Sequence, residues 1–180
     1  GRADTDGAPM CAGHVDFSNR EQVSSTLAKW RQDLEPLDHE EDVSITTDGT
    51  VWHTVGGKRR VHPENIQLQQ GVSLQGSYSY HNPPKETYYS FSADDVDFFF
   101  RYGVQYQQAS DDIYEYTMER TPDTVAPEDA AAEFDRIYAS EACARAFEDE
   151  NWDIDENGYD LVLQQLAELY NFKYERRRKG

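Results

Sequence analysis

Apolar residues recur at helical spacing in the first fifth of the chain. A helix is therefore predicted from about residue 20 to Leu34, with one apolar face toward the core. Ser18 and Glu21 have the spacing of a capping box at its start, and Pro36 ends it. The apolar face consists of Val23, Leu27, Trp30 and Leu34.

Two short β-type segments follow, residues 43–47 and 50–55, on either side of Asp48 and Gly49. An Asp-Gly pair between such segments predicts a β-hairpin. Residues 72–81 alternate and are rich in Tyr and Ser, which predicts a third strand.

The second half of the chain is predicted to be mostly helical. Ser92 caps a helix over residues 93–102, and residues 113–119 alternate like a strand. Helices are then predicted over 127–148 and 159–172. The order α, ββ, β, α, β, α, α indicates a mixed α/β (α+β) domain with a central sheet. We expect one domain over residues 17–180, behind a polar flexible leader over residues 1–16.

Composition narrows the choice of partner. The 180 residues carry a net charge of −18, which repels nucleic acid and anionic membranes, so neither is expected as a partner. No apolar run reaches the roughly 18 residues of a membrane span. No signal peptide is visible, so a cytoplasmic location is expected, with a phage or secreted-toxin context as the alternative.

The basic residues 176–179 are interpreted as a solvated tail. Cys11 and Cys143 form no CxxC pair; a reducing compartment is the simpler interpretation, with one long-range disulfide left open.

A candidate site lies between residues 80 and 95. Tyr80-His81-Asn82-Pro83-Pro84 precedes Ser90-Phe91-Ser92-Ala93-Asp94-Asp95 by a short loop. The pattern is close to His-x-His-Pro followed by Ser-x-x-Asp. In that pattern two histidines at a strand end and a carboxylate on the next helix bind zinc, because catalytic zinc uses three protein ligands and one water.

This stretch resembles the JAMM (MPN-plus, JAB-type) metalloisopeptidase family, especially the bacterial JAB-like domains of phage and polymorphic-toxin proteins. The resemblance covers about residues 38–120 and implies a JAMM-like central sheet flanked by helices. The C-terminal helical pair that we also expect lies outside it and is not explained by it. The resemblance also implies His81 and Asp95 as zinc ligands and Ser92 as the oxyanion donor. Glu40 or Glu41 would be the glutamate that shuttles the proton of the metal-bound water.

The chain departs from the family pattern by one histidine. With a deletion, His81 is the first ligand and the second is missing; without a gap, Tyr80 and Asn82 replace both histidines and His81 lies on the other side of the strand. His53 or His62 could take the place of the missing ligand. Ser92 and Asp95 also fit a simple capping box, and whichever of the two glutamates fails to align would belong to a solvated acidic loop.

A second candidate site lies near residue 155. Asp153, Asp155, Asn157 and Gly158 match the first half of an EF-hand calcium loop. Gln164 stands where the bidentate Glu would be. The alternative is an acidic loop between two helices.

The sequence thus leaves three functions open. The first is a JAB-like zinc metallopeptidase with a damaged and weakly active or inactive site. The second is a non-catalytic module that binds a protein through the old cleft or through Tyr78, Tyr80, Tyr88 and Tyr89. The third is an accessory domain stabilised by calcium.

Overall fold

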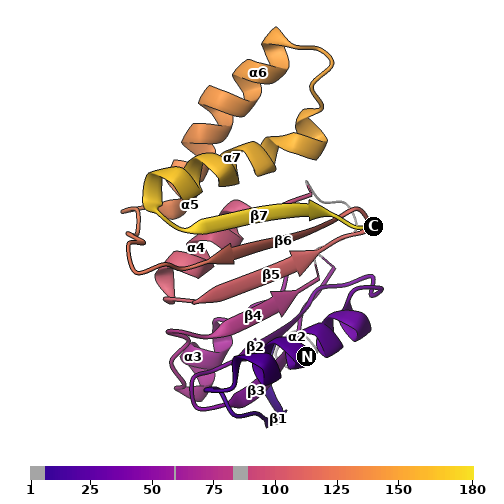
Figure 1. Ribbon diagram of the computed structural model, residues 1–180, viewed down its shortest axis with the longest axis vertical. Coiled ribbons are helices and arrows are strands. Elements are labelled where there is room, and N and C mark those ends of the chain that lie inside the picture. Colours follow the sequence, from indigo (N-terminus) through magenta and orange to yellow (C-terminus); the bar gives the residue numbers. More distant parts are fainter. Residues whose placement is uncertain (1–6, 59, 83–88) are drawn as a thin grey trace.

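The structure is a computed structural model that describes residues 7–58, 60–82 and 89–180. It is a mixed α+β fold, as predicted, built on one seven-stranded sheet in the order β1-β3-β2-β4-β5-β6-β7 (Figure 1). Only the β4–β5 pair is parallel; the other neighbouring strands of this sheet are antiparallel. Pro83, Pro84 and Tyr88, which belong to the predicted motif and tyrosine surface, lie outside the described residues.

The first half of the chain forms one end of this sheet. Strands β2 (Glu41–Ile45) and β3 (Thr50–Val55) are the predicted hairpin, and β2 also pairs with β4 (Tyr78–His81). Of the strand predicted over 72–81, only these last four residues are extended. A short helix that the sequence did not indicate, α3 (Asn65–Gln70), precedes it.

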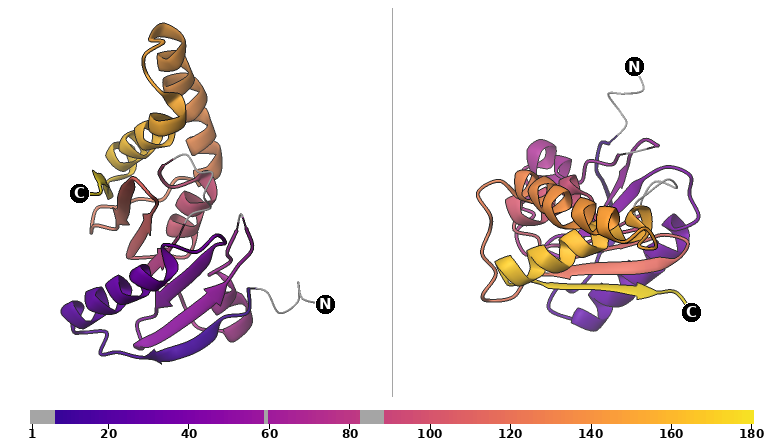
Figure 2. Two further views of the ribbon diagram at one scale, coloured as in Figure 1. Left: turned by 90° about the vertical axis from the view of Figure 1, so that its right-hand side faces the viewer. Right: turned by 90° about the horizontal axis from the view of Figure 1, so that it is seen from above.

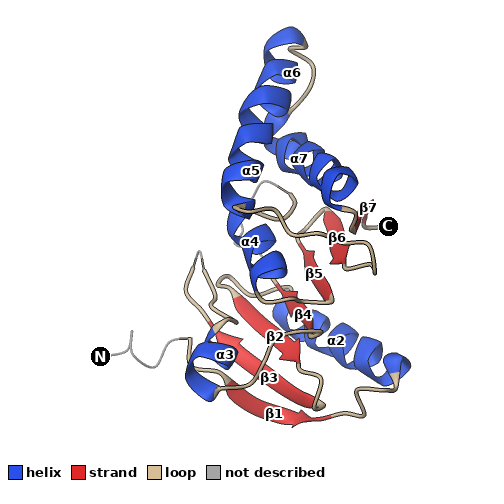
Figure 3. Ribbon diagram, turned by 90° about the vertical axis from the view of Figure 1, so that its left-hand side faces the viewer, coloured by secondary structure: helices blue, strands red, loops and turns tan. Residues whose placement is uncertain are grey.

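Helix α2 (Arg20–Leu34) packs on one face of this half of the sheet (Figure 3). Its predicted apolar residues Val23, Leu27 and Leu34 are buried. The predicted cap is wrong by one residue. Asn19 caps the helix, its Oδ1 accepting from the backbone N–H of Gln22 at 3.1 Å, and the Ser18 hydroxyl donates to Asp16 at 2.6 Å.

The expectation of a flexible leader is wrong over residues 10–14. These residues form β1 (Met10–His14), which pairs antiparallel with β3. The strand is largely exposed at the edge of the sheet, and its sequence, Met-Cys-Ala-Gly-His, lacks the alternation of apolar and polar residues by which strands are detected.

The second half begins with α4 (Ala93–Arg101), which connects β4 to the parallel strand β5 (Tyr106–Ser110). β6 (Tyr114–Glu119) follows as predicted. The sheet ends at β7 (Lys173–Arg178), so the prediction of a solvated basic tail is wrong. The sequence did not predict this strand because basic side chains occupy most of its exposed positions, so the segment resembles a charged tail.

The C-terminal helices extend beyond the sheet (Figure 2). The predicted helix over 127–148 consists of α5 (Ala130–Ile137), a π-helical turn η1 (Tyr138–Ala142) and α6 (Cys143–Glu148). Helix α7 (Ile154–Tyr170) begins five residues earlier than predicted and returns to the sheet.

Two apolar clusters hold these layers together. One lies under α2 and includes Val43, Ile45 and Tyr80. The other lies among α4, α5, α7 and strands β5 and β6, and is dominated by aromatic residues such as Phe91, Phe99 and Tyr116. Successive residues of β2 and β4 point alternately to the two faces of the sheet, so the polar residues between these apolar ones share the α4 side.

Candidate functional site

His81 lies at the end of β4, at the point where the chain leaves the sheet toward α4. Its ring is buried, and its Nε2 lies 3.4 Å from Oδ1 of Asp95 in the first turn of α4. The helix that follows the strand thus brings its first turn to the strand end, and two residues predicted to share a site do so.

This contact decides between the two alignments of the motif. Tyr80 points into the cluster under α2, where its hydroxyl lies 2.7 Å from Oγ of Ser110. His81 is the residue that faces Asp95, so the deletion alignment fits the geometry and the ungapped one does not.

Ser92 forms the predicted capping box with Asp95. The Ser92 Oγ accepts from the Asp95 backbone N–H, and the Asp95 Oδ2 accepts from the Ser92 backbone N–H at 2.9 Å. The Ser92 hydroxyl also donates to Oδ2 of Asp95 at 3.0 Å. The carboxylate therefore has one oxygen bound to the cap and the other directed at His81.

The structure separates the two candidate glutamates. Glu40 is buried on the site side, where the charges of both His81 and Asp95 act on it and the backbone N–H of Val61 donates to its carboxylate. Its backbone is fixed by bonds with Gly56 and Gly57 in the loop after β3. Of the two candidate glutamates, Glu40 is therefore the one that lies on the side of His81 and Asp95.

Glu41 points to the opposite face of the sheet. Its carboxylate lies between His39 and His53, with its Oε1 2.6 Å from Nε2 of His53. The His53 ring also contacts Trp30 of α2, with 4.8 Å between the ring centroids. Neither Glu41 nor His53 can therefore complete a site around His81.

Asn82 occupies the position after His81 with both ends of its amide in use. Its Oδ1 accepts from the backbone N–H of Glu41 at 2.7 Å, and its Nδ2 donates to the backbone carbonyl of His39 at 2.8 Å. Because the residue is buried, these bonds extend the β2–β4 pairing by one residue. Asn82 acts as a structural clamp here.

Asp42 is a site residue that the sequence did not single out. It is fully buried directly opposite His81 and accepts from the hydroxyls of Ser44 and Ser79 at 2.6 and 2.8 Å. The interpretation of this acidic run as a solvated loop is wrong, because all five residues of β2 are buried. The sequence feature that could have indicated a buried strand here is the alternation of Asp42 and Ser44 with Val43 and Ile45.

Four ionisable groups lie on the α4 side of the sheet, and each shifts the pKa of at least one other. They are Glu40, Asp42, His81 and Asp95. Burial raises the pKa of Glu40 to about 8 and that of Asp42 to about 6. Burial alone would lower the pKa of His81, but the charge of Asp95, followed by those of Glu40 and Asp42, outweighs it and raises the pKa to about 9. For Asp95, burial is outweighed by His81 and the Ser92 bonds, which lower the pKa of its carboxyl. His81 and Asp95 therefore form a charged pair near neutral pH.

The distance between the donor atoms of His81 and Asp95 matches that between two ligands of one zinc ion. Two ligand atoms about 2.0–2.2 Å from one tetrahedral zinc lie about 3.3–3.5 Å apart, and the His81–Asp95 separation of 3.4 Å has this value. The Nδ1 of His62 lies 2.7 Å from Oε1 of Glu64. Within the described ranges no group of three or more His, Cys, Asp or Glu side chains is arranged to hold a metal ion.

The predicted calcium residues lie at the start of α7, where a loop was expected. Asp153 caps the helix by accepting from the backbone N–H of Asp155 and Glu156. Asn157 is in the first turns, and its Oδ1 accepts from Arg176 at 2.9 Å. The expected loop is therefore wrong, because the acidic residues favour a helix N-terminus. Calcium binding stays a prediction.

Further features lie away from this site. Cys11 and Cys143 are free and exposed.

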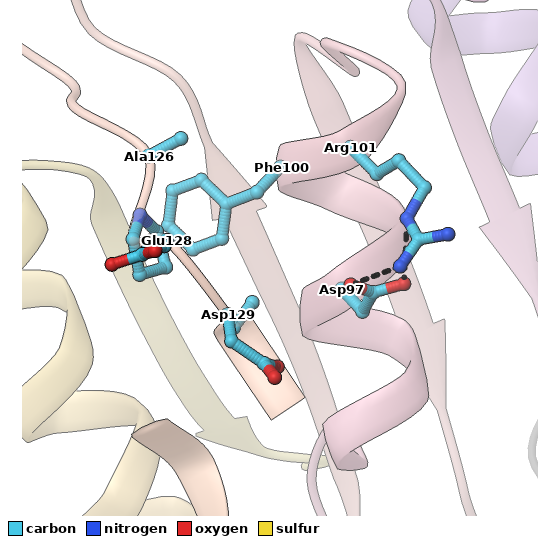
Figure 4. Close-up of a pocket in the computed structure, with 8 residues that line it drawn as sticks. Asp97, Phe100, Arg101, Ala126, Glu128 and Asp129 are labelled. Carbon is cyan, nitrogen blue, oxygen red and sulfur yellow. Dashed lines mark hydrogen bonds and ion pairs between the residues drawn. The ribbon is translucent and has the colours of Figure 1, made fainter. Parts of the chain in front are cut away.

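A pocket of about 310 Å³ lies between α4 and the start of α5, and Asp97, Arg101, Phe100 and Asp129 line part of it (Figure 4). Asp97 is paired with Arg101, and Asp129 caps α5. In the part of the chain that the structure describes, no helix combines the length and apolar character of a bilayer crossing.

Compared with protein-family models, curated proteins and solved structures, the chain matches none of them. The resemblance to the JAMM family therefore rests on the motif residues of the sequence.

Proposed function

We propose that this chain is a JAB-like metallopeptidase-fold protein that has lost its catalytic zinc and acts as a non-catalytic module for binding a protein or peptide. The observation that carries the proposal is the incomplete donor set. Glu40, His81, Ser92 and Asp95 lie together, yet the described residues contain no group of three or more His, Cys, Asp or Glu side chains arranged to hold a metal ion.

The neighbouring residue supports this interpretation. Asn82 follows the histidine, and its amide is committed to the backbone of Glu41 and His39. An amide is a weak ligand for zinc, which prefers imidazole, thiolate and carboxylate donors. The residues retained from the site instead stabilise the fold, since the Ser92–Asp95 pair caps α4 and His81 compensates the charge of Asp95.

The zinc content of the purified protein tests the proposal. After zinc has been offered and the excess removed by gel filtration, elemental analysis is expected to find well below one zinc per chain. A matched variant with one histidine inserted directly after Asn82 restores the His-Asn-His-Pro order and is expected to retain about one zinc. Its His81→Ala counterpart should lose that zinc. About one tightly held zinc in the unaltered protein would overturn the proposal.

A second candidate, a residual zinc peptidase, is favoured by one observation. The 3.4 Å between His81 and Asp95 is longer than the 2.7–2.9 Å of a good charge-assisted hydrogen bond and equals the distance between two zinc ligands. If zinc is retained, hydrolysis of peptide and isopeptide substrates should be measured next. Glu40→Gln should then abolish turnover while zinc stays bound.

A further inference from the structure

Strand β7 forms one edge of the sheet, and the two edges differ in regularity. β1 at the opposite edge is irregular, with a register shift between Cys11 and Gly13. β7 pairs with β6 over all six residues without a shift. It is last in the strand order, so no described strand pairs with its outer side. A regular edge strand presents a row of backbone N–H and C=O groups to which another strand can add.

The edge is held in place before any partner arrives. On the α7 side, the hydroxyl of Tyr174 donates to Asp160 at 2.6 Å. Arg176 donates to the backbone carbonyl of Glu156 at 2.8 Å and to the side chain of Asn157. Such pre-organisation lowers the entropy cost of adding a strand.

The charge of this edge is opposite to that of the molecule. Five of residues 173–179 are basic in a chain of net charge −18. Lys173 and Arg178 are exposed, and the ion pairs of the described residues include neither. The guanidinium of Arg178 lies 6.0 Å from the centroid of the Tyr114 ring.

The inner neighbour of β7 shows which strand chemistry complements it. Glu115 of β6 stands directly opposite Arg177 and forms an ion pair at 2.7 Å, and Glu119 stands opposite Lys173. β6 thus carries carboxylates four residues apart on the face where β7 carries basic groups. Opposite charges across strands stabilise a pair, and like charges directly opposite destabilise it.

We propose that the outer edge of β7 binds an extended acidic segment of a partner protein, which adds to the sheet as an eighth strand. Its acidic residues face Lys173 and Arg177 on one side and Arg178 on the other. A second copy of β7 is a poorer occupant than an acidic strand, because antiparallel pairing of two copies over the whole strand places Lys173 opposite Arg178 at both ends.

The probe for this proposal is a peptide with the sequence of residues 113–120, Ile-Tyr-Glu-Tyr-Thr-Met-Glu-Arg, labelled with a fluorophore. Fluorescence anisotropy at low salt should show saturable binding, and the amides of β7 should exchange more slowly with the peptide bound. The same peptide with both glutamates replaced by lysine should bind at least fivefold more weakly. A peptide N-methylated at alternate positions should not bind.

Variants of the protein complete the test. Lys173→Glu combined with Arg178→Glu should weaken binding at least fivefold, whereas the exposed control Lys29→Glu on α2 should change it less than twofold. The proposal is overturned if the acidic peptide does not bind, if the charge variants bind it equally well, or if the β7 amides gain no protection. It is also overturned if sedimentation shows a dimer that the two substitutions dissociate.

Discussion

At the scale of single residues, Asn82 shows how a position next to the site can serve the fold. Asn82→Ala leaves the backbone N–H of Glu41 and the carbonyl of His39 without their partner. Because the residue is buried, we expect a loss of about 1–3 kcal/mol in the free energy of unfolding, measured by urea denaturation. The exposed control Asn151→Ala should change it by less than about 0.5 kcal/mol. Equal stability of both variants would contradict the clamp role.

The carboxyl of Glu40 makes stability depend on pH in a defined direction. Its pKa rises from 4.5 to about 8 in the folded protein, so the folded state binds more protons between these values. The free energy of unfolding should therefore fall as the pH rises from 4.5 to 8. Asp42 and His81, whose pKa values are also raised, act in the same direction.

Glu40→Gln removes one of these groups and should flatten that fall. Urea denaturation at pH 5, 6.5 and 8 measures it, with the exposed Glu21→Gln as the control. Parallel pH profiles for Glu40→Gln and the unaltered protein would show that the carboxyl does not titrate as described.

At the scale of elements, Ser92 tests the stability of α4. Ser92→Ala removes the side-chain half of the capping box and should cost about 1 kcal/mol. Ser92→Thr keeps a hydroxyl that can cap and should recover most of this loss. Thermal unfolding followed by circular dichroism compares them, and an alanine variant as stable as the parent would contradict the assignment.

Gly158 in α7 is a position where the usual helix rule should fail. Replacing glycine by alanine inside a helix normally stabilises it by up to about 1 kcal/mol. Here the added Cβ would lie 3.0 Å from Ile154 and 3.1 Å from the ring of Tyr138 in η1. We expect Gly158→Ala to lower the melting temperature. Gly57→Ala, where nothing lies within 4 Å of the added Cβ, should leave it nearly unchanged.

Elements with a clear apolar period were predictable from the sequence, and those without one were not. α2, α4 and β6 were found because each has one buried face, and the 43–55 hairpin was found because an Asp-Gly turn separates its two β-type segments. β1 and β7 escaped because edge strands are stabilised by backbone pairing with an inner neighbour, which leaves little apolar alternation. The face of β2 that carries Asp42 and lies beside His81 could be recognised only once the β2–β4 register was known.

At the scale of the whole molecule, the net charge of −18 sets the response to salt. Repulsion among so many carboxylates destabilises the compact state, and salt screens it within a Debye length. Raising NaCl from about 10 mM to about 500 mM should therefore raise the melting temperature at pH 7. A lower melting temperature would mean that surface ion pairs such as Arg177–Glu115 outweigh the repulsion.

The parallel pairing of β4 with β5 has a consequence for how the chain matures. While the protein is being synthesised, residues 10–81 can pair β1, β3, β2 and β4 before β5 leaves the ribosome, so β4 is temporarily the border of an unfinished sheet. His81 lies at that edge of the sheet. Its contact with Asp95 forms only after helix α4, which carries Asp95, has been synthesised. The candidate site is thus assembled when β5 pairs with β4 and the two halves of the sheet join.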